Sequence, residues 1–141
     1  MNVLLDTNVL SEVRRPAPDL NVLKWLDTLD EDRAFLSVVT IAELRRGIAL
    51  MDTGQRRDAL AAWISRDLPN RFEGRTIPID TPIAERWGDL MSEARRRGVA
   101  LSVMDGFLAA TALVRGLVVA TRNTKDFLPA GVTVLNPWTD G

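Results

Sequence analysis

Acidic residues stand in short, distinctive contexts along the whole sequence. They are Asp6 in LLDTNVLSE, Glu43 in SVVTIAELRRG, Asp105 in SVMDGFLAATA and Asp126 in TRNTKDF. Each acid follows an apolar run or opens a helical pattern, so these side chains can converge at one edge of a sheet. Carboxylates brought together repel one another unless a cation joins them, and oxygen-only clusters suit Mg²⁺ or Mn²⁺. A metal held by carboxylates beside a phosphodiester is the working part of many nucleases.

The residue types that are absent narrow the chemistry. The chain has no His and no Cys, which excludes histidine acid–base pairs, thiol catalysis, thiolate metal sites and disulfides. Any hydrolysis must then depend on carboxylates, a metal and water. The sequence has neither a signal-peptide pattern nor an apolar run that could span a bilayer, so the cytoplasm is the expected compartment.

The length and the charge describe one domain that could meet nucleic acid. A chain of 141 residues has the size of a single domain, 1–141. The net charge is −1, yet only Lys24 and Lys125 among the 18 basic residues are not arginine. Arginine forms bidentate contacts with phosphate. For any single arginine cluster, a solvated or paired outer helix face is the stronger explanation.

Strand and helix patterns alternate along the chain. Apolar, β-branched runs predict strands at 2–5, 34–39, 76–79, 117–121 and 132–135. Helical patterns follow Asp6 and Asp80, and cover 20–29, 40–51, 55–68 and 102–115, and Pro69 ends the helix at 55–68. Leu20, Leu23, Leu26 and Leu29 are expected to form the apolar stripe of their helix. The alternation predicts an α/β domain with a mostly parallel sheet of about five strands flanked by helices.

The predicted sheet brings the polar residues together. In open α/β sheets, ligands bind outside the carboxyl ends of the strands. Asp6 follows the first strand, and Asn123 and Asp126 follow the fourth, so they face one crevice if these strands are neighbours. Glu43 and Asp105 are expected in first helical turns, where the helix dipole favours an ionised acid.

Each acid also has a purely structural explanation. Asp6 is a good N-cap residue, and both Thr40–Glu43 and Ser102–Asp105 have the spacing of a capping box. Asp126 could belong to an Asx-turn. Capping and metal binding place an acid in the same region, so the structural and functional interpretations are compatible for Glu43 and Asp105.

Four segments together resemble a known family. LLDTNVLSE, TIAELRRG, DGFLAATA and ATRNTKDF, in this order and at these separations, are similar to a PIN domain of the VapC/FitB toxin type. The resemblance covers essentially the whole chain, including the closing VLNPW. It implies a small α/β domain that cuts RNA with Mg²⁺ or Mn²⁺ as a cofactor. It also implies a homodimer that a cognate antitoxin holds inactive and that meets DNA only through this antitoxin.

The family motif can be carried over residue by residue. Asp6, Glu43 and Asp105 match its three central acids. Close relatives often have Asp where this chain has Asn123, and Asp126 follows three residues later. The resemblance therefore leaves the fourth site residue open between these two. Thr7, Asn8 and Thr121 are expected to orient the acids.

The hypothesis from the sequence is metal-dependent hydrolysis of RNA phosphodiesters. Asp6 and Asp105 are the expected metal ligands, and Glu43 either binds a metal or positions a bound water, with one or two metals possible. An empty acidic pocket repels nucleic acid, so arginines must supply the attraction. Arg122 at the mouth of the crevice, and Arg45 and Arg46 beside Glu43, are the candidate substrate-binding residues.

Two other functions compete with this hypothesis. The chain could be a weakly catalytic subunit of a toxin–antitoxin complex that acts mainly in DNA binding through its partner, since its fourth position is Asn123. A receiver-like phosphoacceptor domain also uses an acidic pocket with Mg²⁺. Such a domain needs a lysine near the end of a later strand, whereas Lys125 lies in a turn beyond the strand.

Overall fold

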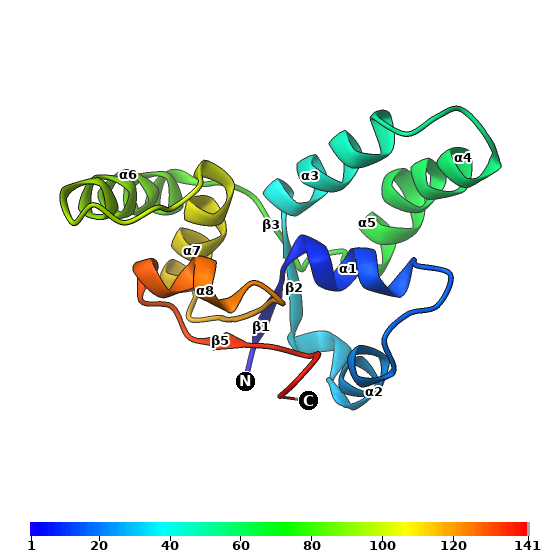
Figure 1. The fold of residues 1–141 in the computed structure, drawn as a ribbon, viewed down its shortest axis with the longest axis horizontal. Helices are drawn as coiled ribbons and strands as arrows, with labels where there is room; N and C mark the ends of the chain where they lie inside the picture. Colours follow the sequence, from blue (N-terminus) through cyan, green and yellow to red (C-terminus); the bar gives the residue numbers. More distant parts are fainter. Residues whose placement is uncertain (141) are drawn as a thin grey trace.

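The computed structural model describes residues 1–140. Its centre is a five-stranded sheet with the order β3-β2-β1-β4-β5, in which every neighbouring pair is parallel (Figure 1). The strands are β1 (Val3–Leu5), β2 (Ala34–Ser37), β3 (Thr76–Ile77), β4 (Val118–Ala120) and β5 (Val134–Leu135). The predicted α/β fold with a parallel sheet is confirmed. The first and fourth strands are direct neighbours, as the predicted crevice requires.

Helices cover both faces of the sheet. They are α1 (Thr7–Val13), α2 (Leu20–Thr28), α3 (Val38–Ala49), α4 (Gln55–Ala62), α5 (Leu68–Arg71), α6 (Thr81–Arg96), α7 (Val103–Arg115) and α8 (Thr124–Phe127). Figure 1 shows α6, α7 and α8 on one side of the sheet and the first five helices on the other. Within residues 1–140, no helix is long and apolar enough to cross a membrane.

The central strand β1 divides the interior into two hydrophobic cores. Val3 and Leu5 belong to the core beneath the first five helices, whereas Leu4 belongs to the core beneath α6 and α7. This division follows from the strand geometry, because successive side chains point to opposite faces. All three residues are almost completely buried. Asp6, the next residue, therefore starts from a rigid position.

Helix α3 begins earlier than the sequence predicts. Strand β2 ends at Ser37, whose hydroxyl accepts a hydrogen bond from the Val39 amide at 3.0 Å and so caps the helix. The predicted capping box of Thr40 and Glu43 is therefore wrong, and Glu43 lies in the second helical turn. The Thr40 hydroxyl is buried and has no hydrogen-bond partner among residues 1–140.

The helical path from Gln55 continues past the predicted stop at Pro69. A π-helical turn, Trp63–Asp67, joins α4 to α5, and the Leu68 amide donates to the Trp63 carbonyl across it. Pro69 then stands near the start of α5, and the helical path continues through it to Arg71. The predicted end of this helix was wrong because the π-helical turn carries the helical path past the proline.

The predicted apolar stripe of α2 is only partly correct. Leu20 is 69% exposed, whereas Val22 and Trp25 are buried, with Leu26 and Leu29 packed against them. A strict three-residue spacing drifts around a helix of 3.6 residues per turn, so steps of three and four must alternate to hold one face. The buried side chains of both α2 and the Gln55–Leu68 segment lie in the core of this one chain.

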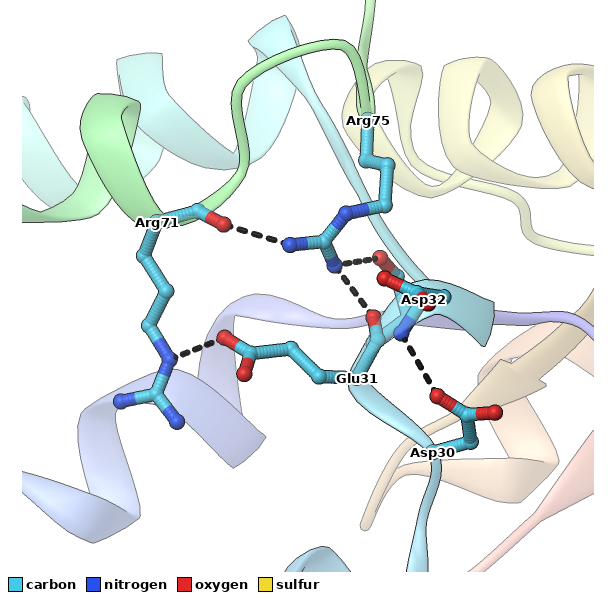
Figure 2. A network of polar contacts seen from close by, with 6 residues as sticks. Asp30, Glu31, Asp32, Arg71 and Arg75 are labelled. Carbon is cyan, nitrogen blue, oxygen red and sulfur yellow. Dashed lines mark hydrogen bonds and ion pairs between the residues drawn. The ribbon is translucent and has the colours of Figure 1, made fainter.

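An arginine network secures the amino edge of the sheet, opposite the predicted crevice. The Arg75 guanidinium donates to the carbonyls of Glu31, Ala34 and Arg71, with a distance of 2.7 Å to the Ala34 oxygen (Figure 2). Arg71 pairs with the Glu31 carboxylate at 2.6 Å. Strand β3 has only two residues, so these bonds add to a short ladder and hold β3 against β2.

Helices α6 and α7 approach each other closely at a glycine. A Cβ atom at Gly106 would lie 2.7 Å from the Met91 sulfur and 3.0 Å from Trp87 Nε1. The Trp87 ring has little freedom to move away, because it stacks on Phe107 at 4.7 Å and donates to the Val103 carbonyl at 3.1 Å. Gly106 therefore sets the position of the helical turn that carries Asp105.

We expect Gly106→Ala to destabilise the protein by about 1–3 kcal/mol, the usual cost of overpacking a tight contact. Gly88→Ala on α6 is the matched control, because nothing beyond its chain neighbours and its own helix backbone lies within 4 Å of its Cβ position. The control should gain about 0.5–1 kcal/mol from the better helix former. Urea unfolding measures both variants. A Gly106→Ala protein as stable as the wild type would contradict the close contact.

Candidate active site

A pocket of about 410 Å³ opens at the carboxyl edge of the sheet. Its lining residues are Asp6, Thr7, Asn8, Ser11, Glu12, Arg15, Glu43, Asp105, Arg122, Asn123 and Trp138. The three predicted central acids thus share one pocket with the predicted Arg122 and Asn123. Arg45 and Arg46 are exposed on α3 and do not line it.

Asp6 is both an N-cap and a wall of this pocket. It is 6% exposed, and its Oδ1 accepts a hydrogen bond from the Thr7 amide at 2.7 Å. Its Oδ2 accepts from the Thr121 hydroxyl at 2.7 Å and from the Asn8 amide group at 3.3 Å. The Asp6 amide donates to the Ala120 carbonyl at 3.0 Å. These bonds fix the carboxylate at the junction of β1 and β4.

The polar residues expected to orient the acids do contact them. The completely buried Thr121 hydroxyl donates to Asp6 and also accepts from the Asn123 amide at 3.0 Å. The Thr7 hydroxyl donates to Glu43 Oε1 at 2.9 Å. Glu43 reaches the pocket from α3 through this bond, although it does not lie in a first helical turn as predicted.

Asp105 enters the pocket from the start of α7. Ser102 caps this helix, and its hydroxyl accepts from the Asp105 amide at 3.2 Å. The predicted first-turn position of Asp105 is therefore correct. The Ser102 hydroxyl thus holds the backbone amide of Asp105, and Asp105 lines the pocket.

Burial and like charges perturb two of these acids. Burial raises the pKa of Asp6 above its ordinary value, the hydrogen bonds from Thr121 and Thr7 lower it, and the charges of Glu43 and Asp126 raise it again. Burial also raises the pKa of Asp105, against the hydrogen bond with Ser102, and the charges of Asp6 and Asp126 add to the rise. Burial and mutual repulsion thus disfavour the ionised forms of Asp6 and Asp105, and a nearby cation would favour these forms again.

The donor set fits a hard divalent cation with a partial water shell. Among residues 1–140, no three acidic side chains form a ready-made ligand group. Mg²⁺ sheds water reluctantly and is usually held by one or two carboxylates with several waters retained. A pocket with separated carboxylates and amide and hydroxyl oxygens suits such an ion better than it suits a metal caged wholly by protein.

Asn123 and Asp126 are the two candidates for the fourth residue of the site, and the structure places them differently. Asn123 lines the pocket and precedes α8, and its amide is held by Thr121. Asp126 lies within α8 instead of in the Asx-turn that its context allowed, and it is exposed outside the pocket lining. Its charge nonetheless raises the pKa of both Asp6 and Asp105. Asn123 offers an oxygen, while Asp126 offers negative potential.

Four lining residues had no part in the sequence-based site. Ser11, Glu12 and Arg15 follow Asn8 by three, four and seven positions, the spacing that places side chains on one helix face. This spacing was the signal that could have found them. Trp138 comes from the other end of the chain, and no local pattern links it to the pocket.

The family match agrees with this geometry. A family model described as PIN domain matches residues 3–129. The chain belongs to the PIN-domain family. Its PIN domain is 42% identical to Toxin FitB of Neisseria gonorrhoeae over 98% of this chain and 99% of that protein. It is 39% identical to VapC ribonuclease Y4jK of Sinorhizobium fredii, over 96% of this chain and 97% of that protein. The resemblance to the VapC/FitB type is confirmed.

Solved structures share the whole PIN-domain fold. The crystal structure of FitAcB from Neisseria gonorrhoeae matches with a TM-score of 0.91 at 42% identity, over 97% of this chain and 99% of that one. FitAB bound to an IR36 DNA fragment gives 0.90 at 40% identity, over 96% and 95%. A toxin–antitoxin complex from Klebsiella pneumoniae gives 0.70 at 26% identity, over 96% and 98%.

The raised pKa of Asp105 predicts a pH-dependent effect of its removal. The folded state binds the Asp105 proton more tightly than the unfolded chain does, so ionisation at neutral pH costs stability. We expect Asp105→Asn to be more stable than the wild type at neutral pH in EDTA. The gain should shrink as the pH falls through the raised pKa, and disappear below the ordinary value of 3.8. Urea unfolding across this pH range measures it; a gain that grows with acid would refute the assignment.

Proposed function

We propose that this PIN domain is the toxin of a toxin–antitoxin pair and a metal-dependent endoribonuclease of the cytoplasm. The observation that carries the proposal is the shared pocket of Asp6, Glu43 and Asp105 in a chain without His or Cys. Its relatives support the same activity, since one is named a toxin and another a VapC ribonuclease.

The proposed cofactor is Mg²⁺ or Mn²⁺. Asp6 and Asp105 would hold it, with Glu43 either as a further ligand or as the group that positions a bound water. When bound, such an ion lowers the pKa of water and stabilises charge on a phosphate. One ion or two would both fit these carboxylates. Asn123, through its amide oxygen, is the better candidate for the fourth group, because it lines the pocket and Asp126 does not.

Neutral side chains would orient the site carboxylates, and an arginine would bind the RNA. Thr121 and Asn8 hold the Asp6 carboxylate, and Thr7 holds that of Glu43. Arg122 at the pocket mouth would contact a phosphate of the RNA. Without His, the route through a 2′,3′-cyclic phosphate has no obvious general base, so we expect direct hydrolysis that leaves a 5′-phosphate and a 3′-hydroxyl.

A cognate antitoxin is the proposed protein partner, and DNA would be met only through it. Solved relatives support this, since they include FitAB with DNA and a toxin–antitoxin complex. A homodimer is also part of the proposal. The buried side chains of α2 and of the Gln55–Leu68 segment lie in the core of the chain, so they are not available to a dimer interface. Sedimentation of the partner-free protein would test it.

A weakly catalytic subunit is the second candidate function. Two points favour it: position 123, where the family resemblance implies an acid, is Asn, and no three acids among residues 1–140 form a ready ligand group. The complex would then act mainly in DNA binding through the antitoxin; a solved relative, FitAB, is bound to a DNA fragment. Turnover separates the two functions.

RNA cleavage by the purified, partner-free protein is the deciding experiment. We expect cleavage with Mg²⁺ or Mn²⁺, none with EDTA, and a loss of at least about 100-fold in Asp105→Asn, beyond the 10–100-fold effect of an orienting residue. The substitution keeps the shape and the Ser102 cap but removes the charge. A folded wild type that is inactive on a broad RNA panel would favour the binding subunit. Equal cleavage by both proteins would place the site elsewhere.

Thr121→Val tests the orienting hydrogen bonds without removing a carboxylate. Valine has nearly the same shape but neither donates to Asp6 nor accepts from Asn123. We expect cleavage to fall about 10–100-fold, with part of the loss recovered at high Mg²⁺ concentration. Thr111→Val, at a buried threonine whose hydroxyl bonds only the Phe107 carbonyl, is the control and should keep full activity. An unchanged rate in Thr121→Val would show that Asp6 needs no such support.

A further inference from the structure

Two arginines line the acidic pocket at opposite ends of α1, and each is held by a buried partner. Arg15 follows the last turn of the helix, and Arg122 lies beside its first turn. We propose that Arg15 and Arg122 form a two-point clamp for the RNA backbone, positioned by Glu12 and Trp138. The clamp rests on the proposed nuclease function and adds how the substrate is held over the carboxylates.

Glu12 holds Arg15 at the far end of the pocket. Glu12 is 4% exposed, which is rare for a glutamate. Its Oε1 lies 3.2 Å from an Arg15 guanidinium nitrogen, and its Oε2 accepts from the Asp19 amide at 3.0 Å. Both carboxylate oxygens are therefore engaged. The Arg15 side chain remains 61% exposed, so most of its N–H groups can meet a phosphate.

Trp138 holds Arg122 at the near end. The Arg122 guanidinium lies 5.3 Å from the centre of the Trp138 ring, within the range of a cation–π contact. The Arg122 amide also donates to the Asn8 side chain at 3.3 Å. Stacking occupies a face of the guanidinium and leaves the N–H groups at its edge for a phosphate.

The end of the chain is built to present Trp138. The Asn136 side chain accepts from the Trp138 amide at 2.9 Å, and Asn21 at the start of α2 donates to the Trp138 carbonyl at 3.0 Å. Asp140 closes the turn by accepting from the Asn136 amide at 2.9 Å. Trp138 is itself buried, so it cannot stack on a base, and its contribution passes through Arg122.

The two arginines bracket the acids along the helix. Arg122 contacts Asn8 in the first turn of α1, whereas Arg15 lies two residues beyond the end of this helix at Val13. A strand that contacts both arginines must pass over the pocket that contains Asp6 and Glu43. Two fixed cations also offset the repulsion between the carboxylates and RNA, and their rigid mounts reduce the entropy lost on binding.

The test is the salt dependence of binding to a single-stranded RNA oligonucleotide, with the full chain in EDTA to prevent cleavage. Each phosphate contact contributes about 0.7 to the slope of log K against log salt. We expect Arg15→Gln and Arg122→Gln each to lower the slope by about 0.7, and the double variant by about 1.4. Arg33→Gln, which removes an exposed arginine just before β2 at the opposite edge, should leave it unchanged.

Variants of Trp138 and Glu12 test whether these residues position the two arginines. Trp138→Leu should lower the slope as Arg122→Gln does and raise KM while kcat stays near the wild-type value; Trp138→Phe keeps an aromatic face and should restore both. Glu12→Gln should act like Arg15→Gln. A folded Trp138→Leu protein with the wild-type slope and KM would show that Trp138 is only a core residue. If that variant does not fold, the two arginine variants still decide whether the clamp exists.

Failure of the clamp and failure of the nuclease proposal give different results. Wild-type slopes in both arginine variants, in a protein that cleaves RNA with a metal, overturn the clamp and leave the nuclease intact. Reduced slopes in a protein without metal-dependent cleavage support the clamp and overturn the nuclease. A wild type that does not bind the oligonucleotide overturns the clamp whatever its activity. An unchanged slope in one variant only reduces the clamp to a single contact and overturns the two-point form.

Discussion

The hydrogen bond from Thr121 to Asp6 is the interaction on which the pocket depends. It joins residues 115 positions apart in the sequence, and it forms only because β1 and β4 are neighbours that end level with each other. Thr121 also accepts from Asn8 and from the Asn123 amide. The first turn of α1 and the segment after β4 therefore share one buried hydroxyl, and the side chains at the pocket mouth depend on its position.

Gathering buried carboxylates in one pocket destabilises their charged forms, and this destabilisation indicates a functional site. Burial raises the pKa of Asp6 and of Asp105, the charge of Asp126 adds to both rises, and the charge of Asp6 adds to the rise at Asp105. A fold selected only for stability would replace one of them with a neutral side chain. Hydrogen bonds from Thr121 and Thr7 offset part of the cost for Asp6, but they do not remove the repulsion. Perturbed acids that gather in a cleft are typical of sites that bind a cation or do chemistry.

Local patterns predicted what local geometry controls. Asp6 and Asp105 could be placed because a strand end and a helix start each confine an acid to one position. Glu43 reached the pocket for a different reason from the predicted one, since β2 stops at Ser37 and shifts the cap away from Thr40. Trp138 could not be found at all, because its approach to Arg122 requires the whole path of β5 and the closing turn. The spacing of residues in one sequence does not predict contacts between segments that are far apart in the chain.

Charge is distributed along α1 in a way that explains the neutral Asn123. A carboxylate at that position would add another negative charge near Asp6, whose carboxylate accepts hydrogen bonds from the neutral donors Thr7, Asn8 and Thr121. With Asn123, the pocket keeps an oxygen ligand, and the extra negative charge lies outside the lining on Asp126. With Asn123, the pocket carries less negative charge to repel a phosphate bound by Arg15 or Arg122 at the two ends of α1. Under the proposed function, negative charge is concentrated where the metal ion would bind, and positive charge lies where the RNA backbone would enter and leave.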